Sequence, residues 1–180
     1  RVAHLVLDYN GTLAADGTLL PGVAPRLEAI HRLGVSLHIV TADTNGTAAQ
    51  QCAALPVELL VREGGAVARE KAALVERLGP GETAAVGNGR NDVDMLRAAG
   101  LSLAVIGDEG AFSGALLAAH VVCRNIAEAL DLLLLPHRLK ASVRGKLYHR
   151  ETLCKRRPDA PTWSGRQRPT TPSSPSSCAM

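Results

Sequence analysis

The chain has 180 residues, of which 46% are apolar, so it can bury the core of one globular domain. No apolar run approaches the roughly 18 residues that a membrane-spanning helix needs, so we expect no membrane anchor of that kind. The formal net charge of +3 hides a split: there are 10 basic and 15 acidic residues up to Pro136, then 10 basic and two acidic residues from His137 onward.

The termini and the cysteines place further bounds on the chain. It begins with Arg1, which suggests a trimmed or incomplete start, and RVAHLVLD is too short and ends too acidic to be a secretory signal. Its four cysteines lie far apart without C-x-x-C spacing, so neither a zinc site nor a disulfide framework is predicted. This cysteine usage favours a reducing compartment, and we expect a cytoplasmic protein.

Short apolar runs alternate with helical patterns over residues 1–144, as is typical of a parallel α/β sheet. The run VAHLVL is nearly continuously apolar, which indicates a strand covered on both faces. The predicted elements, in chain order, are strand 2–7, helix 21–33, strand 35–40, helix 46–55, strand 57–61, helix 66–79, strand 83–87, helix 92–99, strand 101–106, helix 114–119, strand 120–123 and helix 126–135. We therefore predict a doubly wound sheet in one domain, residues 1–144.

The remaining residues, 145–180, are rich in Pro, Ser, Thr and Arg and poor in aliphatic side chains. They cannot bury enough apolar surface to offset the entropy of ordering, so we predict a disordered basic tail. Its charge could contact nucleic acid, but Trp163 is its one residue suited to stacking on bases. Apart from this tail, we expect no nucleic-acid partner.

Polar residues follow three of the predicted strands: Asp8, Thr41 and the segment GNGRND at 87–92. The carboxyl ends of parallel strands meet at one edge of a sheet, which is where such folds bind ligands. Asp8 suits a nucleophile or a metal ligand, although a turn of the D-x-N-G-T type serves structure equally well. Thr41 could donate a hydrogen bond to a phosphoryl oxygen, or could simply cap a turn.

Lys71 is the first lysine of the chain, and no other occurs before residue 140, although arginine is frequent. A compact ammonium differs from a guanidinium fork and suits a position between a nucleophilic carboxylate and a phosphoryl group. The alternative is a single surface lysine. In GNGRND, the oxygens of Asn88, Asn91 and Asp92 are hard ligands, so facing Asp8 they predict a Mg²⁺ site. The segment lacks the third glycine of a dinucleotide-binding loop.

The order DYNGT, VTAD, Lys71, GNGRND resembles the four motifs of the haloacid dehalogenase (HAD) superfamily. The segment from REKAALVERL to AAVGNGRNDVDMLRAAGLSLAVIGDEGA is similar to the phosphorylation domain of P-type ATPases, as in the soluble P-type ATPase-like HAD hydrolases. The resemblance implies that Asp8 attacks phosphorus to form an aspartyl-phosphate. It implies catalytic roles for Asp8, Asn10, Thr41 and Lys71; substrate contacts for Gly11, Thr12, Thr41, Ala42, Lys71 and Asn91; and Mg²⁺ ligation by Asp8, Asn10 (main-chain carbonyl), Asn88 and Asp92.

Two positions depart from the pattern of HAD phosphatases. Most carry aspartate at the position of Asn10, where it acts as general acid and base; an amide cannot exchange a proton in this way. P-type ATPases have threonine there and still form the phosphoenzyme, so we expect substrates with good leaving groups. Asn88 replaces a metal-binding aspartate, and this substitution should weaken Mg²⁺ binding.

The chain leaves no room for an inserted cap domain, either between Leu13 and Val35 or between Thr41 and Lys71. Capless members of this superfamily tend to act on macromolecules or to borrow a lid from a neighbouring subunit. We therefore expect a phosphorylated small molecule or a phosphoprotein as substrate, with homo-oligomerisation as an option.

Three other functions compete with a phosphohydrolase or phosphotransferase. A weakly active or regulatory phospho-acceptor is consistent with both asparagines. A receiver domain would place its acceptor after the third strand and an acidic pair after the first, and this chain has neither. A pure scaffold would not need a coherent constellation for Mg²⁺ and phosphate.

Overall fold

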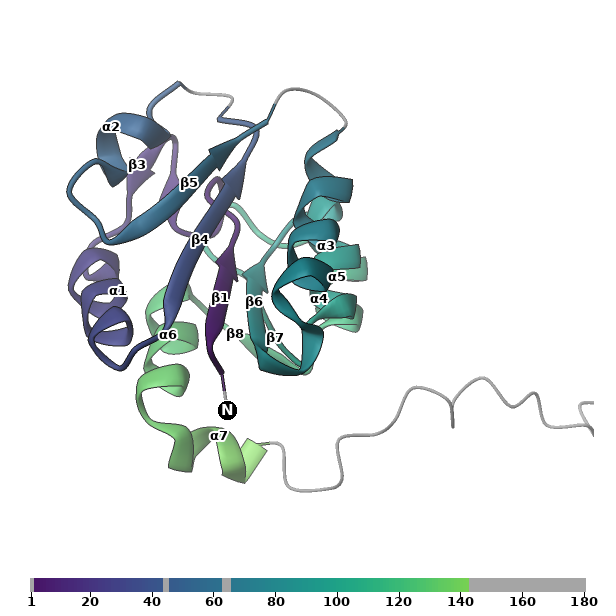
Figure 1. The fold of residues 1–180 in the computed structure, drawn as a ribbon. Helices are drawn as coiled ribbons and strands as arrows, with labels where there is room; N and C mark the ends of the chain where they lie inside the picture. The colour runs from purple at the N-terminus through teal and green to yellow at the C-terminus, as the bar shows by residue number, and fades with distance from the viewer. Residues whose placement is uncertain (1, 44–45, 63–65, 143–180) are drawn as a thin grey trace, which may run out of the picture. The chain divides into compact units, whose positions relative to one another are not determined.

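The computed structural model describes residues 2–43, 46–62 and 66–142, without the side chains of 140–142. The predicted tail, 145–180, lies outside the described residues. The predicted domain is a parallel sheet with helices on both faces, which confirms the expected fold class (Figure 1).

The sheet contains six parallel strands in the order β5-β4-β1-β6-β7-β8. The strands are β1 (His4–Leu7), β4 (Ser36–Thr41), β5 (Val57–Val61), β6 (Thr83–Gly87), β7 (Leu101–Val105) and β8 (Val121–Cys123). The chain winds outward from β1 to β5 and then crosses back to β6, so the strand order reverses between β1 and β6. Ligands of doubly wound folds bind at such a switch point, beyond the carboxyl ends of the strands.

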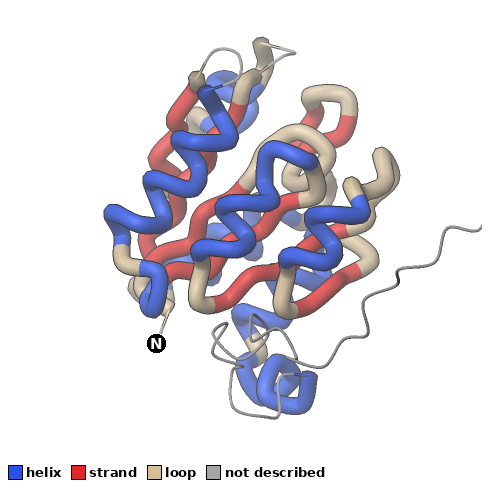
Figure 2. Tube along the Cα trace, turned by 90° about the vertical axis from the view of Figure 1, so that its right-hand side faces the viewer, coloured by secondary structure: helices blue, strands red, loops and turns tan. Residues whose placement is uncertain are grey.

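Helices cover the sheet in two layers. The helices are α1 (Val23–Arg32), α2 (Ala48–Cys52), α3 (Val67–Leu78), α4 (Val93–Ala98), α5 (Ser113–Ala118), α6 (Ile126–Leu134) and α7 (Pro136–Ser142). Figure 2 shows α3, α4 and α5 side by side across the face turned to the viewer. Residues of α1, α2 and α6 pack into the core on the opposite face.

Alternation along each strand divides the core between the two faces. Leu5 and Leu7 of β1 join the cluster under α1 and α6, whereas Val6 joins the cluster under α3 and α4. All three side chains are fully buried, as expected for a central parallel strand covered on both faces. This alternation sends the residue after Leu7 toward the α3 side.

The hairpin formed by β2 (Ala14–Ala15) and β3 (Thr18–Leu19) was not predicted as strands. Its two-residue loop places Asp16 at φ 49° and Gly17 at φ 76°. Two successive positive φ angles are typical of a type I′ turn, for which Asp-Gly is a favoured sequence. The dipeptide was therefore a usable signal.

Two helices also differ from the predicted ranges. Helix α2 is shorter than the predicted 46–55. The predicted helix 126–135 is followed by the additional helix α7, which begins at Pro136. Proline lacks the N–H that would continue α6, but it fits the first turn of a new helix. No helix within the described ranges is long and apolar enough to cross a membrane.

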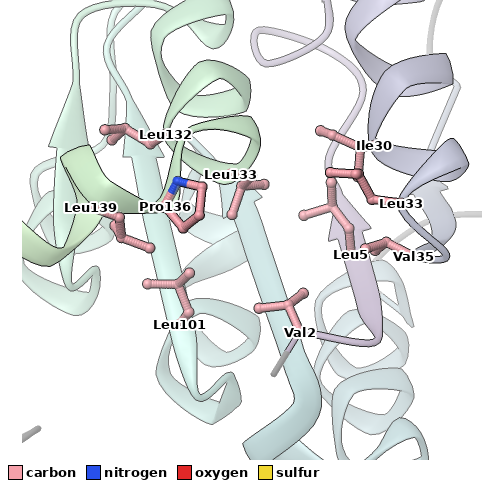
Figure 3. A pocket seen from close by; sticks show the side chains of 10 residues that line it. All are labelled: Val2, Leu5, Ile30, Leu33, Val35, Leu101, Leu132, Leu133, Pro136 and Leu139. Carbon is pink, nitrogen blue, oxygen red and sulfur yellow. The ribbon is translucent and has the colours of Figure 1, made fainter.

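A pocket of about 360 Å³ lies near the amino ends of β1, β4 and β7. Its lining is aliphatic and includes Val2, Leu33, Leu101, Pro136 and Leu139 (Figure 3). Such a lining offers no side-chain donor or charge to a phosphate group. The chemistry of this fold must therefore be sought at the opposite, carboxyl end of the strands.

Candidate active site

Asp8 follows β1 at the switch point and is the centre of the polar cluster. Its backbone N–H donates to the carbonyl of Val86 at 3.0 Å, which continues the pairing of β1 with β6. Strand alternation directs its side chain to the same face as Val6, toward α3. The residue is 5% exposed, so its carboxylate is largely withdrawn from water.

Lys71 reaches this carboxylate from α3. Its Nζ lies 2.5 Å from Asp8 Oδ1 and 2.7 Å from Asp92 Oδ1, and the side chain is fully buried. A buried ammonium is stable only when paired, and here two carboxylates share it. The structure thus places Lys71 between Asp8 and Asp92, and the catalytic role of this lysine stays a prediction.

Asp92 is held by the loop that follows β6. Its Oδ2 accepts hydrogen bonds from the backbone N–H groups of Asn88 (3.0 Å) and Gly89 (2.8 Å), while Oδ1 accepts from Lys71. A Cβ on Gly87 would lie 2.5 Å from the Asp92 carboxyl carbon, so only glycine allows this approach. Both carboxylate oxygens of Asp92 therefore accept hydrogen bonds from within the protein.

Thr12 contacts the second oxygen of Asp8. Its Oγ1 lies 3.0 Å from Asp8 Oδ2 and 3.2 Å from Asn88 Oδ1. The Asn88 amide is oriented by its Nδ2, which donates to the carbonyl of Gly110 at 3.1 Å. This bond turns Asn88 Oδ1 toward Thr12 and the Asp8 side of the loop.

The electrostatics follow from burial. Burial, and then the charge of Asp92, raise the pKa of Asp8 from 3.8 to about 6, although Lys71 opposes the shift. For Lys71, burial favours the neutral form, but Asp8 and Asp92 outweigh it and raise the lysine pKa above its usual value. The lysine is therefore charged at neutral pH.

The other predicted site residues lie around this cluster. Thr41 ends β4 and is 1% exposed; its Oγ1 accepts from the N–H of Asp43, and no hydrogen bond joins it to Asp8 in the described part of the chain. Ala42 follows it, half-buried. Asn91 is exposed, with its Oδ1 beside Gly89. Asn10 is half-buried and forms a β-bridge with Ala14.

Gly11 forms the tight turn after Asn10. Its φ is 72°, and its N–H donates to the carbonyl of Ala14 at 2.8 Å. A Cβ at this position would lie 2.5 Å from Asn88 Nδ2 and 3.0 Å from Glu109 Oε2. Glycine thus serves both the backbone angle and the close approach of two side chains.

Sequence reasoning did not single out two acidic residues near these strand ends. Asp43 Oδ1 accepts from the N–H groups of Thr47 and Ala48 and so caps the start of α2. Glu109 follows β7 and accepts from the N–H of Asp16 in the hairpin at 3.2 Å. The segment GDEG after a predicted strand was the available signal for Glu109, by the same rule that singled out Asp8.

The donor set near Asp8 suits a hard cation. Thr12 Oγ1 contacts both Asp8 Oδ2 and Asn88 Oδ1, so the three side chains offer oxygen ligands to the same region. Within the described ranges, no group of three or more His, Cys, Asp or Glu side chains is arranged to hold a metal ion. A cation would therefore rest on one carboxylate, amide and main-chain oxygens and water, which is the sparse protein ligation typical of Mg²⁺.

Comparison with known proteins identifies the family. The model of the haloacid dehalogenase-like hydrolases matches residues 1–100, which is more than half of the chain. The chain belongs to this family, and the prediction of a HAD hydrolase is confirmed. An uncharacterized protein of Methanocaldococcus jannaschii is 52% identical over 60 residues, which span 33% of this chain and 64% of that protein.

Solved structures share the fold. The 3-deoxy-D-manno-octulosonate 8-phosphate phosphatase of Moraxella catarrhalis, solved with magnesium, phosphate and KDO, has a TM-score of 0.65 at 15% identity, covering 79% of this chain and 92% of that one. A putative HAD subfamily III A hydrolase of Legionella pneumophila has a TM-score of 0.63 at 19% identity, with coverages of 78% and 86%. At these identities the likeness establishes the fold.

Proposed function

We propose that this chain is a Mg²⁺-dependent phosphohydrolase or phosphotransferase that works through an aspartyl-phosphate on Asp8. The observation that carries the proposal is the buried Lys71 between Asp8 and Asp92, with Thr12 on the second oxygen of Asp8. Phosphoryl transfer depends mainly on positioning and charge neutralisation, which this cluster is built to provide. Membership of a hydrolase family, and phosphatases among the proteins of the same fold, support a phosphate ester or anhydride as substrate.

The proposed chemistry begins at the Asp8 oxygen that Lys71 does not hold. Asp8 Oδ2 attacks phosphorus in line, and the bond between phosphorus and the leaving-group oxygen breaks. Thr12 and Lys71 lie at the two sides of the carboxylate, where they can donate to the phosphoryl oxygens. Asn10 cannot protonate the departing oxygen, so good leaving groups are favoured. Contacts of Thr41, Ala42 and Asn91 with the phosphoryl group stay predictions.

A Mg²⁺ ion would be held by Asp8, the main-chain carbonyl of Asn10 and the side-chain oxygen of Asn88. When bound, the ion neutralises charge on the phosphoryl group and the carboxylate. Asp92 was predicted as a further ligand. Because both of its oxygens accept hydrogen bonds from the protein, we assign it instead to positioning Lys71 and the loop after β6.

The finer assignment is a HAD hydrolase of the soluble P-type ATPase-like kind. It is supported by an amide at Asn10, where a P-type ATPase also lacks a carboxylate, and by the motifs around Lys71 and Asp92. Between β1 and α1 the described chain inserts only a short hairpin, so a phosphoprotein, or a small phosphorylated molecule covered by a second subunit, fits the open site. We keep the cytoplasm as the proposed location.

The alternative is a regulatory phospho-acceptor with little hydrolysis. It is favoured by the same two amides, since Asn10 and Asn88 remove a proton carrier and a negative charge from the site. In that case the phosphoryl group would reach Asp8 but leave it slowly.

Turnover of paired substrates tests the proposal. Purified protein with Mg²⁺ should hydrolyse p-nitrophenyl phosphate faster than an alkyl phosphate, and Asp8→Asn should abolish both activities. Asn10→Asp should raise turnover by supplying a proton carrier, most strongly for the alkyl substrate. Equal low rates in wild type and Asp8→Asn would contradict the enzyme assignment.

A further inference from the structure

The proposed function leaves one proton without a carrier. When water hydrolyses an aspartyl-phosphate, a base must accept a proton from that water, and the amide of Asn10 cannot. A carboxylate elsewhere at the carboxyl end of the sheet could take this role. The following inference rests on the proposed function.

The inner carboxylates near Asp8 are already engaged. Asp92 is fully buried, and its oxygens accept from Lys71 and from two backbone N–H groups. Asp43 caps α2 through Oδ1, which accepts from two backbone N–H groups. Hydrogen bonds thus occupy both oxygens of Asp92, and those of Asp43 commit its Oδ1 to the start of α2.

Glu109 differs from these residues because it is exposed yet firmly placed. The loop around it is fastened to the site: Asn88 Nδ2 donates to the Gly110 carbonyl at 3.1 Å, and the N–H of Phe112 donates to the Asn88 carbonyl at 2.8 Å. Its own Oε1 accepts from the N–H of Asp16 at 3.2 Å. The loop that carries Glu109 is thus fastened to Asn88, and the Glu109 carboxylate is bonded to the hairpin.

Gly11 provides the space for this carboxylate. Glu109 Oε2 lies 3.0 Å from the position that a Cβ on Gly11 would occupy, and Asn88 Nδ2 lies 2.5 Å from the same position. Gly11 is next to Asn10 in the chain. The Glu109 carboxylate therefore lies beside Gly11, close to the amide of Asn88.

We infer that Glu109 is the general base for hydrolysis of the Asp8 phosphate, in the role that Asn10 cannot fill. In this step the water oxygen bonds to phosphorus, the bond between phosphorus and the Asp8 oxygen breaks, and the Asp8 carboxylate is regenerated. The proton of the water passes to Glu109. Glu109 later releases this proton to solvent.

The test is Glu109→Gln, assayed in the full chain with Mg²⁺ and p-nitrophenyl phosphate by rapid quench. Glutamine keeps an oxygen that accepts from the Asp16 N–H, so it removes proton transfer and retains the hydrogen bond. We expect dephosphorylation to slow by about 100-fold or more, and phosphorylation to change by less than about threefold. The hydroxylamine-sensitive phosphoenzyme should consequently accumulate. Adding Asn10→Asp should restore its hydrolysis.

Asp108→Asn is the matched control, because it removes the neighbouring exposed carboxylate from the same loop. We expect both steps in this variant to stay within about threefold of wild type. If the phosphoenzyme of the Glu109→Gln variant were hydrolysed at the wild-type rate, the inference would be overturned. Equal slowing of both steps would also overturn it, by showing a purely structural role. A wild-type protein that forms no phosphoenzyme would instead overturn the proposed function, on which the inference depends.

Discussion

At the scale of single residues, the site is a buried charge cluster in which one ammonium serves two carboxylates. The Lys71 ammonium pairs with Asp92, which is bonded to the loop after β6, and the same ammonium pairs with Asp8. Because the cluster carries an excess negative charge in a buried place, it is costly for folding in the absence of a cation. The buried charge that Asp8 needs for the proposed phosphoryl transfer therefore lowers the stability of the fold.

The pH dependence of stability follows from this opposition. The pKa of Asp8 in the folded protein, about 6, exceeds its ordinary value of 3.8, so the folded state binds this proton more tightly than the unfolded chain. The stabilisation is complete below pH 3.8 and is lost as the pH rises through 6. In EDTA at pH 7.5, we expect Asp8→Asn to be more stable than wild type by up to about 3 kcal/mol.

Denaturant unfolding of both proteins between pH 4 and pH 8 measures this difference. The two curves should converge near pH 4, where wild-type Asp8 is protonated in the folded state. Asp94→Asn, an exposed carboxyl on α4, is the control and should show no such divergence. An Asp8→Asn protein that is less stable than wild type at pH 7.5 would contradict the account of the cluster.

Replacing the lysine tests the cluster from the other side. Lys71→Met leaves two carboxylates buried without their cation, so we expect a loss of about 3–5 kcal/mol of stability at pH 7.5. Adding Asp8→Asn should recover part of that loss, because only Asp92 then remains charged. Arg69→Met, on the exposed side of the same helix, is the matched control. No recovery in the double variant would show that the two charges are not coupled.

At the scale of elements, the loops at the carboxyl ends of the strands depend on glycine at close approaches. Gly87→Ala would place a Cβ 2.5 Å from the Asp92 carboxyl carbon, so we expect Asp92 to move away from Lys71. Turnover should fall by about 10-fold or more, since misplacement of about 1 Å has such effects. Gly81→Ala, where a Cβ meets no atom within 4 Å, should leave turnover unchanged. Equal activity in the two variants would contradict this role for Gly87.

Some features of the fold and the site were predictable from the sequence, and others were not. Strand positions were predictable because parallel strands buried on both faces are nearly continuously apolar, as at His4–Leu7. The approach of Asp8, Thr41 and the loop after β6 to one edge followed from parallel topology. The shared contact of Lys71 with Asp8 and Asp92 did not, because periodicity gives a helix face but not the reach of one side chain. The position of Glu109 beside Gly11 depends on a hairpin whose Asp-Gly turn was overlooked.

At the scale of the whole molecule, both cores and the charge cluster are built from residues between Leu5 and Leu130. A chain that ends at Arg144 should therefore retain the melting temperature and the turnover of the full protein. Calorimetry and the p-nitrophenyl phosphate assay on the shortened chain check this expectation. A clear loss of turnover would show that residues 145–180 take part in the activity.

The central claim is that Asp8 carries the phosphoryl group, and acid quench of the reacting protein tests it most directly. With Mg²⁺ and p-nitrophenyl phosphate, the quenched protein should hold a phosphoryl group that hydroxylamine removes, and mass spectrometry should place the resulting hydroxamate on Asp8. Lys71→Met should reduce the trapped amount, and Asp8→Asn should abolish it. Turnover of substrate with no such adduct, or with the adduct at another residue, would contradict the account.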